Sequence, residues 1–171
     1  MTKREPREVK NLDGYGNAAL QWSRVRDALA ALGSQHVTFW LGTTGRKGRP
    51  HSAGVGAVWY DDDLYIVSGP GTRKSRDLAA NPASTLSVAV PGIDVVFEGK
   101  ATRVTDARTL ERLAAHYREN GWPAKVEGDA FTAPYSAPSA GPPPWYLYRF
   151  TFHAAFAVAG EEPYGATRWR F

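Results

Sequence analysis

The sequence contains no cysteine and no long apolar run. Without cysteine, a disulfide framework, a thiolate zinc site and a cysteine nucleophile are all excluded. No segment approaches the roughly 18 consecutive apolar residues that a membrane-spanning helix needs. The charged stretch 1–10 also lacks the apolar core of a signal peptide. We therefore expect a cytoplasmic protein that has no membrane partner.

A large excess of one charge is also missing. The 171 residues include 21 Lys and Arg against 17 Asp and Glu, which gives a net charge of +4. Six of the cations form two clusters, at 46–49 and 73–76, and three aspartates at 61–63 lie between these clusters. No nucleic-acid recognition motif accompanies these clusters, so we do not expect nucleic acid as a partner. Hydrophobic residues make up 43% of the chain, and its length is that of one folded domain.

Residue patterning predicts a mainly β protein of the α+β class: a small barrel of six to seven antiparallel strands with helices at its ends. The predicted helices are 18–32, 72–80 and 106–120, and the predicted strands are 36–44, 50–60, 64–68, 85–90, 94–104 and 145–158. In the last strand, the even positions from Tyr148 to Val158 should face the core. Residues 1–16 are expected to form an N-terminal arm, and 17–171 a single domain in which 122–144 is a Pro-rich loop.

No motif for side-chain catalysis is present. The four histidines fall in four separate predicted elements, so no metal site is expected. The sequence has no Gly-x-Ser-x-Gly elbow and no P-loop. The glycines at 14 and 16 have the spacing of a dinucleotide fingerprint, but no strand precedes them, which favours a turn. If the protein is an enzyme, a cofactor should therefore supply the chemistry.

The segment 68–78 is the strongest candidate for a binding site. A strand ends there, glycines follow, and Thr72, Arg73 and Lys74 stand at the start of a helix. A helix N-terminus presents free N–H groups and the positive end of a dipole, so cations at this position favour a bound anion. One interpretation is a phosphate site with Arg73 and Lys74 as ligands; the alternative is a solvated basic turn.

A second unusual feature is the run of small residues in the strand over 50–60. Ser52, Ala53, Gly54 and Val55 begin this run, although strands usually favour bulkier side chains. Glycine inside a strand often marks the close approach of a ligand or of another backbone. A flat aromatic ring held by main-chain groups would explain the pattern, and so would a tightly packed barrel corner.

The order and spacing of several short motifs resemble the split-barrel flavoproteins of the pyridoxamine 5′-phosphate oxidase superfamily, which includes F420-dependent oxidoreductases. The motifs are Gly48-Arg-Pro50, Asp63-Leu-Tyr-Ile-Val-Ser68, Arg73-Lys-Ser-Arg-Asp-Leu78 followed by Asn81-Pro82, and Phe97-Glu-Gly-Lys-Ala101. The resemblance implies an FMN-binding split β-barrel. It also implies a homodimer that holds FMN or F420 in a groove between its subunits.

Matched positions extend the resemblance to particular residues. Lys74, with Arg73 and Thr72 beside it, would hold the cofactor phosphate. The backbone of 52–55 would face the ring, and Ser68 would line the same groove.

The closing Trp169 and Arg170 are similar to a Trp and an Arg that pyridoxamine phosphate oxidases supply to the flavin. Those oxidases also carry an Arg and a Lys on the second strand, where this chain has Ala53 and Val58. A true pyridoxamine 5′-phosphate oxidase is therefore the less favoured function, and the choice between F420 and FMN stays open.

The function that these expectations favour is an oxidoreductase. It would transfer a hydride between the bound cofactor and a small conjugated organic substrate. Tyr60, Trp145 and Tyr146 are candidates for the substrate wall. The alternative is a carrier that binds a flavin, a deazaflavin or haem without turnover.

Overall fold

The computed structural model describes residues 4–33, 37–137 and 140–171 of the chain. The helices are α1 (Trp22–Ala30), α2 (Arg73–Ala80) and α3 (Ala107–Glu119). The strands are β1 (Glu8–Asn11), β2 (Phe39–Thr44), β3 (Pro50–Val55), β4 (Ala57–Tyr60), β5 (Asp63–Ser68), β6 (Ala83–Val90), β7 (Ile93–Arg103), β8 (Lys125–Glu127), β9 (Ala130–Thr132), β10 (Tyr146–Ala159) and β11 (Gly165–Arg170). His36, where the first predicted strand begins, lies outside the described residues.

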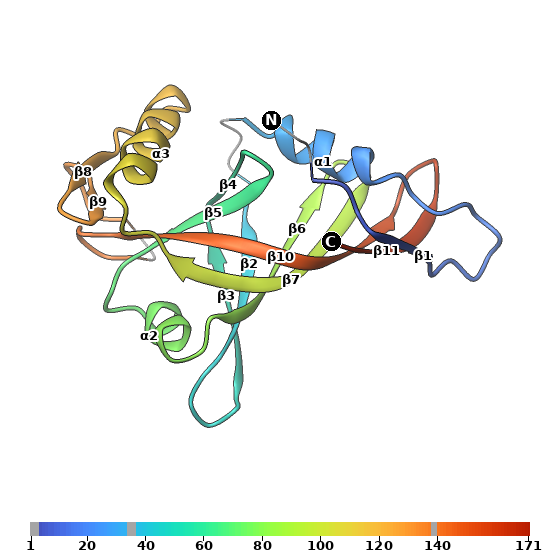
Figure 1. Ribbon diagram of the computed structural model, residues 1–171, viewed down its shortest axis with the longest axis horizontal. Helices are drawn as coiled ribbons and strands as arrows, with labels where there is room; N and C mark the ends of the chain where they lie inside the picture. The colour runs from blue at the N-terminus through green and yellow to red at the C-terminus, as the bar shows by residue number, and fades with distance from the viewer. Residues whose placement is uncertain (1–3, 34–36, 138–139) are drawn as a thin grey trace.

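Seven of these strands form a barrel in the centre of the molecule (Figure 1). Antiparallel pairing runs from β3 through β2, β6, β7 and β10 to β5 and β4. The chain itself joins β3 to β4 across Gly56, which closes the ring. Within the described residues β3 pairs with β2 and β4 pairs with β5, so the wall is split at this bend. The predicted mainly β class with helices at the barrel ends is confirmed, with more strands than the six to seven predicted.

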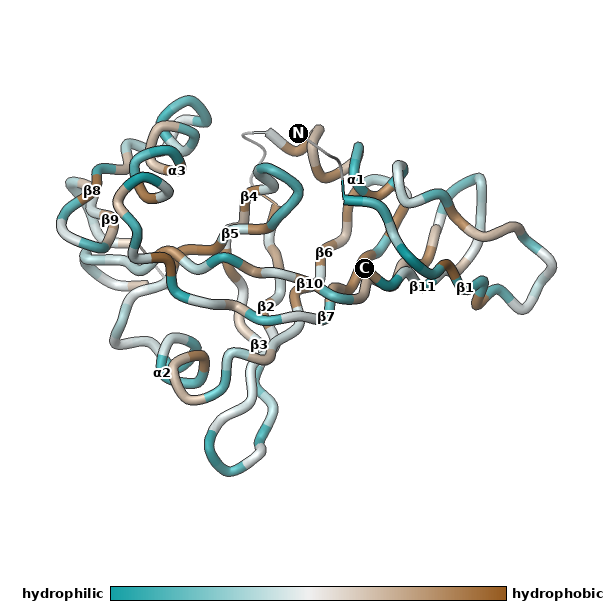
Figure 2. The backbone as a smooth tube through the Cα atoms, viewed as in Figure 1, coloured by the Kyte–Doolittle hydropathy of each residue, from teal (hydrophilic) through white to brown (hydrophobic). Residues whose placement is uncertain are grey.

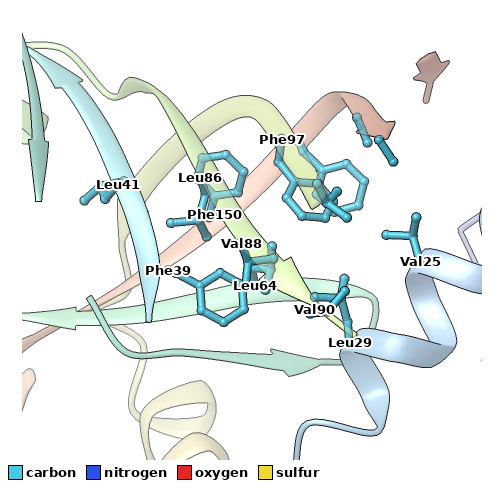
Figure 3. Close-up of a cluster of buried hydrophobic side chains, with 14 of the residues drawn as sticks. Val25, Leu29, Phe39, Leu41, Leu64, Leu86, Val88, Val90, Phe97 and Phe150 are labelled. Atoms are coloured by element: carbon cyan, nitrogen blue, oxygen red, sulfur yellow. The ribbon is translucent and has the colours of Figure 1, made fainter. Parts of the chain in front are cut away.

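Apolar side chains from the strands and from α1 fill the barrel. Figure 3 shows Val25 and Leu29 of α1 beside the inward-facing side chains of the wall. Phe97 and Phe150 are fully buried there, and their rings belong to the same cluster as Trp22. Burial of each large apolar side chain stabilises the fold by about 1.5–3 kcal/mol. The barrel is therefore a packed core, and any ligand site must lie on its outside or at its ends.

Side-chain oxygens cap two of the three helices. Thr72 caps α2 and Asp106 caps α3, each through its side-chain oxygen. α1 begins at Trp22, later than the predicted start at residue 18, and the side chain of Gln21 before it makes no capping hydrogen bond. Gly121 follows α3 with a φ of +90°, in agreement with the predicted stop.

A β-bulge in β10 changes which side chains reach the core. The register between β10 and β7 shifts between Phe152 and Ala154, so His153 is the extra residue. Even positions are buried up to Phe152, as predicted, but Val158 is 58% exposed and Ala157 is buried. One inserted residue reverses the alternation of faces along a strand, which explains the error beyond position 152.

Both regions expected to lack regular structure contain strands. β1 lies within the predicted arm and pairs with β11, where Glu8 stands opposite Arg170. The predicted Pro-rich loop contains the β8–β9 hairpin, which packs with α3 at one end of the barrel (Figure 1). Figure 2 shows hydrophilic residues on α3 and along the β2–β3 hairpin, and hydrophobic residues along the barrel strands.

Candidate functional site

The turn that joins β5 to α2 is held by three hydroxyl groups. The hydroxyl of Ser75 donates to Ser68 over 2.8 Å, and Ser68 Oγ lies 2.9 Å from Thr72 Oγ1. Thr72 Oγ1 also accepts a hydrogen bond from the Ser75 backbone N–H at 3.3 Å. Ser68 is fully buried. The predicted site residues Ser68 and Thr72 therefore fix the N-terminus of α2, and Ser68 presents no surface to a groove.

Two cations stand in the first turn of α2. Lys74 is only 6% exposed, and this burial lowers the pKa of its ammonium group. Arg73 is half-exposed, and its Nε lies 3.6 Å from Asp77 Oδ2. Helix N–H groups together with a buried ammonium group suit a phosphate, because a charged hydrogen-bond partner roughly doubles the strength of such a bond. The residues at this turn thus fit the phosphate of a flavin-type cofactor.

Asp77 attaches α2 to the barrel. Its Oδ2 accepts a hydrogen bond of 3.1 Å from the hydroxyl of Thr43 on β2. A side chain at Gly45 would begin 3.3 Å from the other Asp77 oxygen, so the start of the β2–β3 turn also lies against the helix. The basic turn at 46–49 is therefore at the same end of the molecule as α2 (Figure 1).

An open groove of about 720 Å³ runs across the outer face of β3, β2, β6 and β7. Its lining residues are Trp40, Gly42, Thr43, Thr44, Pro50, His51, Ser52, Ala83, Ser84, Thr85, Ser87, Glu98, Gly99 and His153. Gly42 shapes the floor, because the hydroxyl of Thr85 occupies the space that a side chain would need there. Thr43 is among the lining residues, but its buried side chain points to the opposite face of β2 and binds Asp77, so the groove and α2 share strand β2.

The small residues of β3 lie along this groove and the barrel interior. Ser52 is exposed and lines the groove, opposite Gly42. Ala53 and Gly54 are half-buried, and Val55 is buried in the core. Among the described strands β3 pairs with β2 alone, so its other edge leaves main-chain groups available for hydrogen bonds.

Trp169 and Arg170, the predicted cofactor contacts near the C-terminus, lie apart from the groove and from the α2 turn. Trp169 is 0% exposed, and its ring lies 5.5 Å from that of Trp22 in the core. Arg170 is exposed on β11, with Nη1 3.5 Å from Glu8 Oε2. β11 lies at the opposite end of the sheet from α2 (Figure 1). The indole of Trp169 has a structural role, because it offers no surface that a cofactor could contact.

The three residues predicted for a substrate wall also lie apart. Trp145 is 1% exposed, and its indole N–H donates to the carbonyl of Gly141 at 3.2 Å. Tyr60 packs against α3, with its ring 4.8 Å from that of His116. Tyr146 is half-buried and stands opposite Ser68 in the β5–β10 pairing, which makes it the one closest in register to the α2 turn.

Sequence reasoning missed Asp77 and Thr43. Asp77 stands four residues after Arg73, and this helical spacing was a readable signal for an ion pair. No sequence signal connects Thr43 to Asp77, because the contact depends on how α2 docks on β2.

The described residues contain no group of three or more His, Asp or Glu that could hold a metal ion. The helices described are all too short or too polar to cross a membrane.

Comparisons with known proteins agree with this fold. The family model described as pyridoxamine 5′-phosphate oxidase matches residues 25–154. No curated protein matches the sequence. A putative pyridoxamine 5′-phosphate oxidase from Listeria innocua is similar in structure, with a TM-score of 0.53 and 17% identity, over 77% of this chain and 95% of the other.

Two further solved structures share the fold with different named functions. An F420 reductase matches with a TM-score of 0.50 and 18% identity, over 73% of this chain and 93% of the other. A haem-binding protein from Mycobacterium smegmatis matches with a TM-score of 0.59 and 17% identity, over 86% of this chain and 59% of the other. The family model covers well over half of the sequence, and the chain therefore belongs to the pyridoxamine 5′-phosphate oxidase family of split barrels.

Proposed function

We propose that the protein binds FMN or F420 and transfers a hydride between this cofactor and a small conjugated organic substrate. The observation that carries the proposal is the Thr43–Asp77 hydrogen bond, which fixes α2, with its cationic first turn, against β2, a strand that also lines the groove. In this proposal the phosphate would lie at the start of α2 and the flat ring in the groove, with β2 common to both. Family membership and the structural similarity to an F420 reductase support the same assignment.

Each part of the site has a separate role in this proposal. Lys74 and the first N–H groups of α2 hold the phosphate, and Arg73 adds a second positive charge near the helix start. The main chain of 52–55 holds the ring, and Tyr146 contacts the substrate. The bound cofactor supplies the hydride, while the protein fixes the reacting partners and excludes water from them. A homodimer would cover the open groove, and we propose this state for the active protein.

The decisive experiment is a titration of the purified protein with FMN and with F420, followed by absorbance and fluorescence. Lys74→Ala should weaken binding at least about tenfold, because a charge-assisted hydrogen bond contributes about 1.5–3 kcal/mol. Lys100→Ala is the matched control, since Lys100 is an exposed lysine on β7. Equal affinities of the wild type and the Lys74 variant for both cofactors would reject the phosphate assignment.

A carrier of haem or flavin without turnover is the second candidate. The groove contains His51 and His153, and imidazole is a common axial ligand of haem iron. The haem-binding neighbour from Mycobacterium smegmatis has the same fold. A Soret band on haem addition that is lost in His51→Ala or His153→Ala would support the carrier. Rapid oxidation of the bound reduced cofactor by added acceptors would support the enzyme.

A further inference from the structure

Three arginines from three different elements surround a second hollow, of about 290 Å³, on the outside of the barrel near α3. Arg103 ends β7, Arg112 lies on α3, and Arg149 lies on β10. The remaining lining residues are Asp61, Tyr65, Thr102, Val104, Thr105, Asp106 and Thr109. None of these residues belongs to the groove along β3 or to the α2 turn, so this hollow is a separate feature.

Two of the three guanidinium groups are already held in place. Arg103 lies over the ring of Tyr146 at 3.4 Å and makes a 2.7 Å ion pair with Asp129. Arg149 donates from Nε to the buried carboxylate of Asp63 at 2.6 Å. Such contacts reduce the side-chain entropy that binding would otherwise remove, so the hollow is organised before a ligand arrives.

Arg112 differs from the other two. Its guanidinium lies 5.6 Å from the centre of the Tyr60 ring, and among the described residues it makes no ion pair. Asp129 pairs with Arg103 and Asp63 with Arg149, whereas Asp106 interacts with Arg112 only at longer range, so Arg112 keeps hydrogen-bond donors for a ligand. A guanidinium fork matches the geometry of a carboxylate or phosphate group.

Neutral donors complete the lining. Tyr65 is buried, and this burial raises the pKa of its hydroxyl, which therefore remains a protonated donor at neutral pH. Thr102, Thr105 and Thr109 add three further hydroxyl groups. Of the two carboxylates, Asp106 is engaged with the backbone N–H of Thr109 at 2.8 Å. Asp61 lies exposed in the turn between β4 and β5.

We propose that this hollow binds a small oxyanion, in the form of a carboxylate or phosphate group, with Arg112 as its charged partner. The hydroxyl groups of Tyr65 and the threonines supply neutral hydrogen bonds to the same group. The site does not depend on the function proposed for the α2 turn. Its ligand is a small acid, because the hollow has less than half the volume of the groove along β3.

The test is calorimetric titration at low ionic strength with two probes, inorganic phosphate and malonate. The Lys74→Ala variant is the starting protein, so that phosphate binding at α2 does not contribute. Arg112→Gln should weaken binding of the preferred probe at least about fivefold, since the exposed guanidinium makes charge-assisted bonds to the ligand that solvent weakens only in part. Arg108→Gln on the same helix removes the same charge from an exposed residue outside the hollow and should leave the affinity unchanged.

Arg112→Lys provides a second variant that keeps the charge but loses the fork, and we expect an intermediate affinity. Tighter binding of phosphate or of malonate identifies which group the hollow prefers, and either result supports the site. Absence of saturable binding of both probes would overturn the proposal. Equal losses in the Arg112→Gln and Arg108→Gln variants would also overturn it, because the effect would then be one of net charge.

Discussion

The hydroxyl of Thr43 on β2 donates a 3.1 Å hydrogen bond to the carboxylate of Asp77 on α2. Thr43 is 1% exposed, so water cannot easily replace this contact. The same carboxylate lies 3.6 Å from Arg73. One acidic side chain therefore connects the barrel wall to a cation at the start of the helix, and the position of the cationic turn depends on it.

Removing this hydrogen bond should loosen α2. In Thr43→Val the shape is kept but the donor is lost, and hydrogen bonds to charged groups contribute about 1.5–3 kcal/mol. We expect the free energy of unfolding to fall by about 1.5 kcal/mol and the affinity for FMN or F420 to fall as well. Urea denaturation and cofactor titration measure both effects. Thr151→Val, at an exposed position on β10, is the control, and an equal loss there would contradict the assignment.

The buried carboxylate of Asp63 should be a main support of the barrel. It is 1% exposed and forms ion pairs with Arg149 and Arg4. Both arginines remain partly exposed and can regain water, so we expect Asp63→Asn to cost about 2–3 kcal/mol, below the usual range for a fully buried pair. Chemical denaturation measures this cost. Asp94→Asn, an exposed change on β7, should have no such effect.

The cap of α3 should make stability depend on pH. The backbone N–H of Thr109 donates to Asp106, and this hydrogen bond lowers the pKa of the carboxyl group. A lowered pKa in the folded state means that the stabilisation is present above the unfolded pKa, about pH 4, and is lost as the pH falls. The wild type should therefore exceed Asp106→Ala in stability at pH 7 and approach it near pH 3. A difference that is independent of pH would show that charge plays no part in this cap.

The buried hydroxyl of Tyr117 should lower the stability of the fold. It is buried, no described residue offers it a hydrogen bond, and burial raises its pKa. A buried polar group without a partner costs about 1–3 kcal/mol, so Tyr117→Phe should raise the free energy of unfolding by about 1 kcal/mol. Thermal and urea denaturation test this expectation. Tyr164→Phe, at a half-exposed position, should leave stability unchanged.

Local patterns predicted much of this fold. The predicted helices 72–80 and 106–120 closely match α2 and α3, whose capping residues Thr72 and Asp106 act through short-range chemistry. The alternation along β10 predicts buried residues correctly as far as Phe152 and fails after the bulge at His153. Nothing in the residues around His153 indicates an insertion, because a bulge is defined by the pairing with a partner strand.

The candidate site was predictable in its parts but not in its assembly. The cations at the start of α2 and the small residues of β3 are visible in the sequence. The contact that unites them is not, since Thr43 and Asp77 are distant in the chain and meet only when α2 docks. Trp169 is the opposite case. Its position near the C-terminus resembles a cofactor contact in the sequence, but the structure shows its side chain buried in the core.

The split in the barrel wall at Gly56 has a consequence for how this protein can change. Because β3 pairs on one side only among the described strands, its free edge presents peptide groups to whatever lies beside it. Peptide groups are the same for every amino acid, so substitutions at Ser52 or Ala53 alter the contour of this edge and leave its hydrogen-bonding groups intact. Under the proposed function, single substitutions here would change ligand preference and leave the main-chain hydrogen-bonding groups in place.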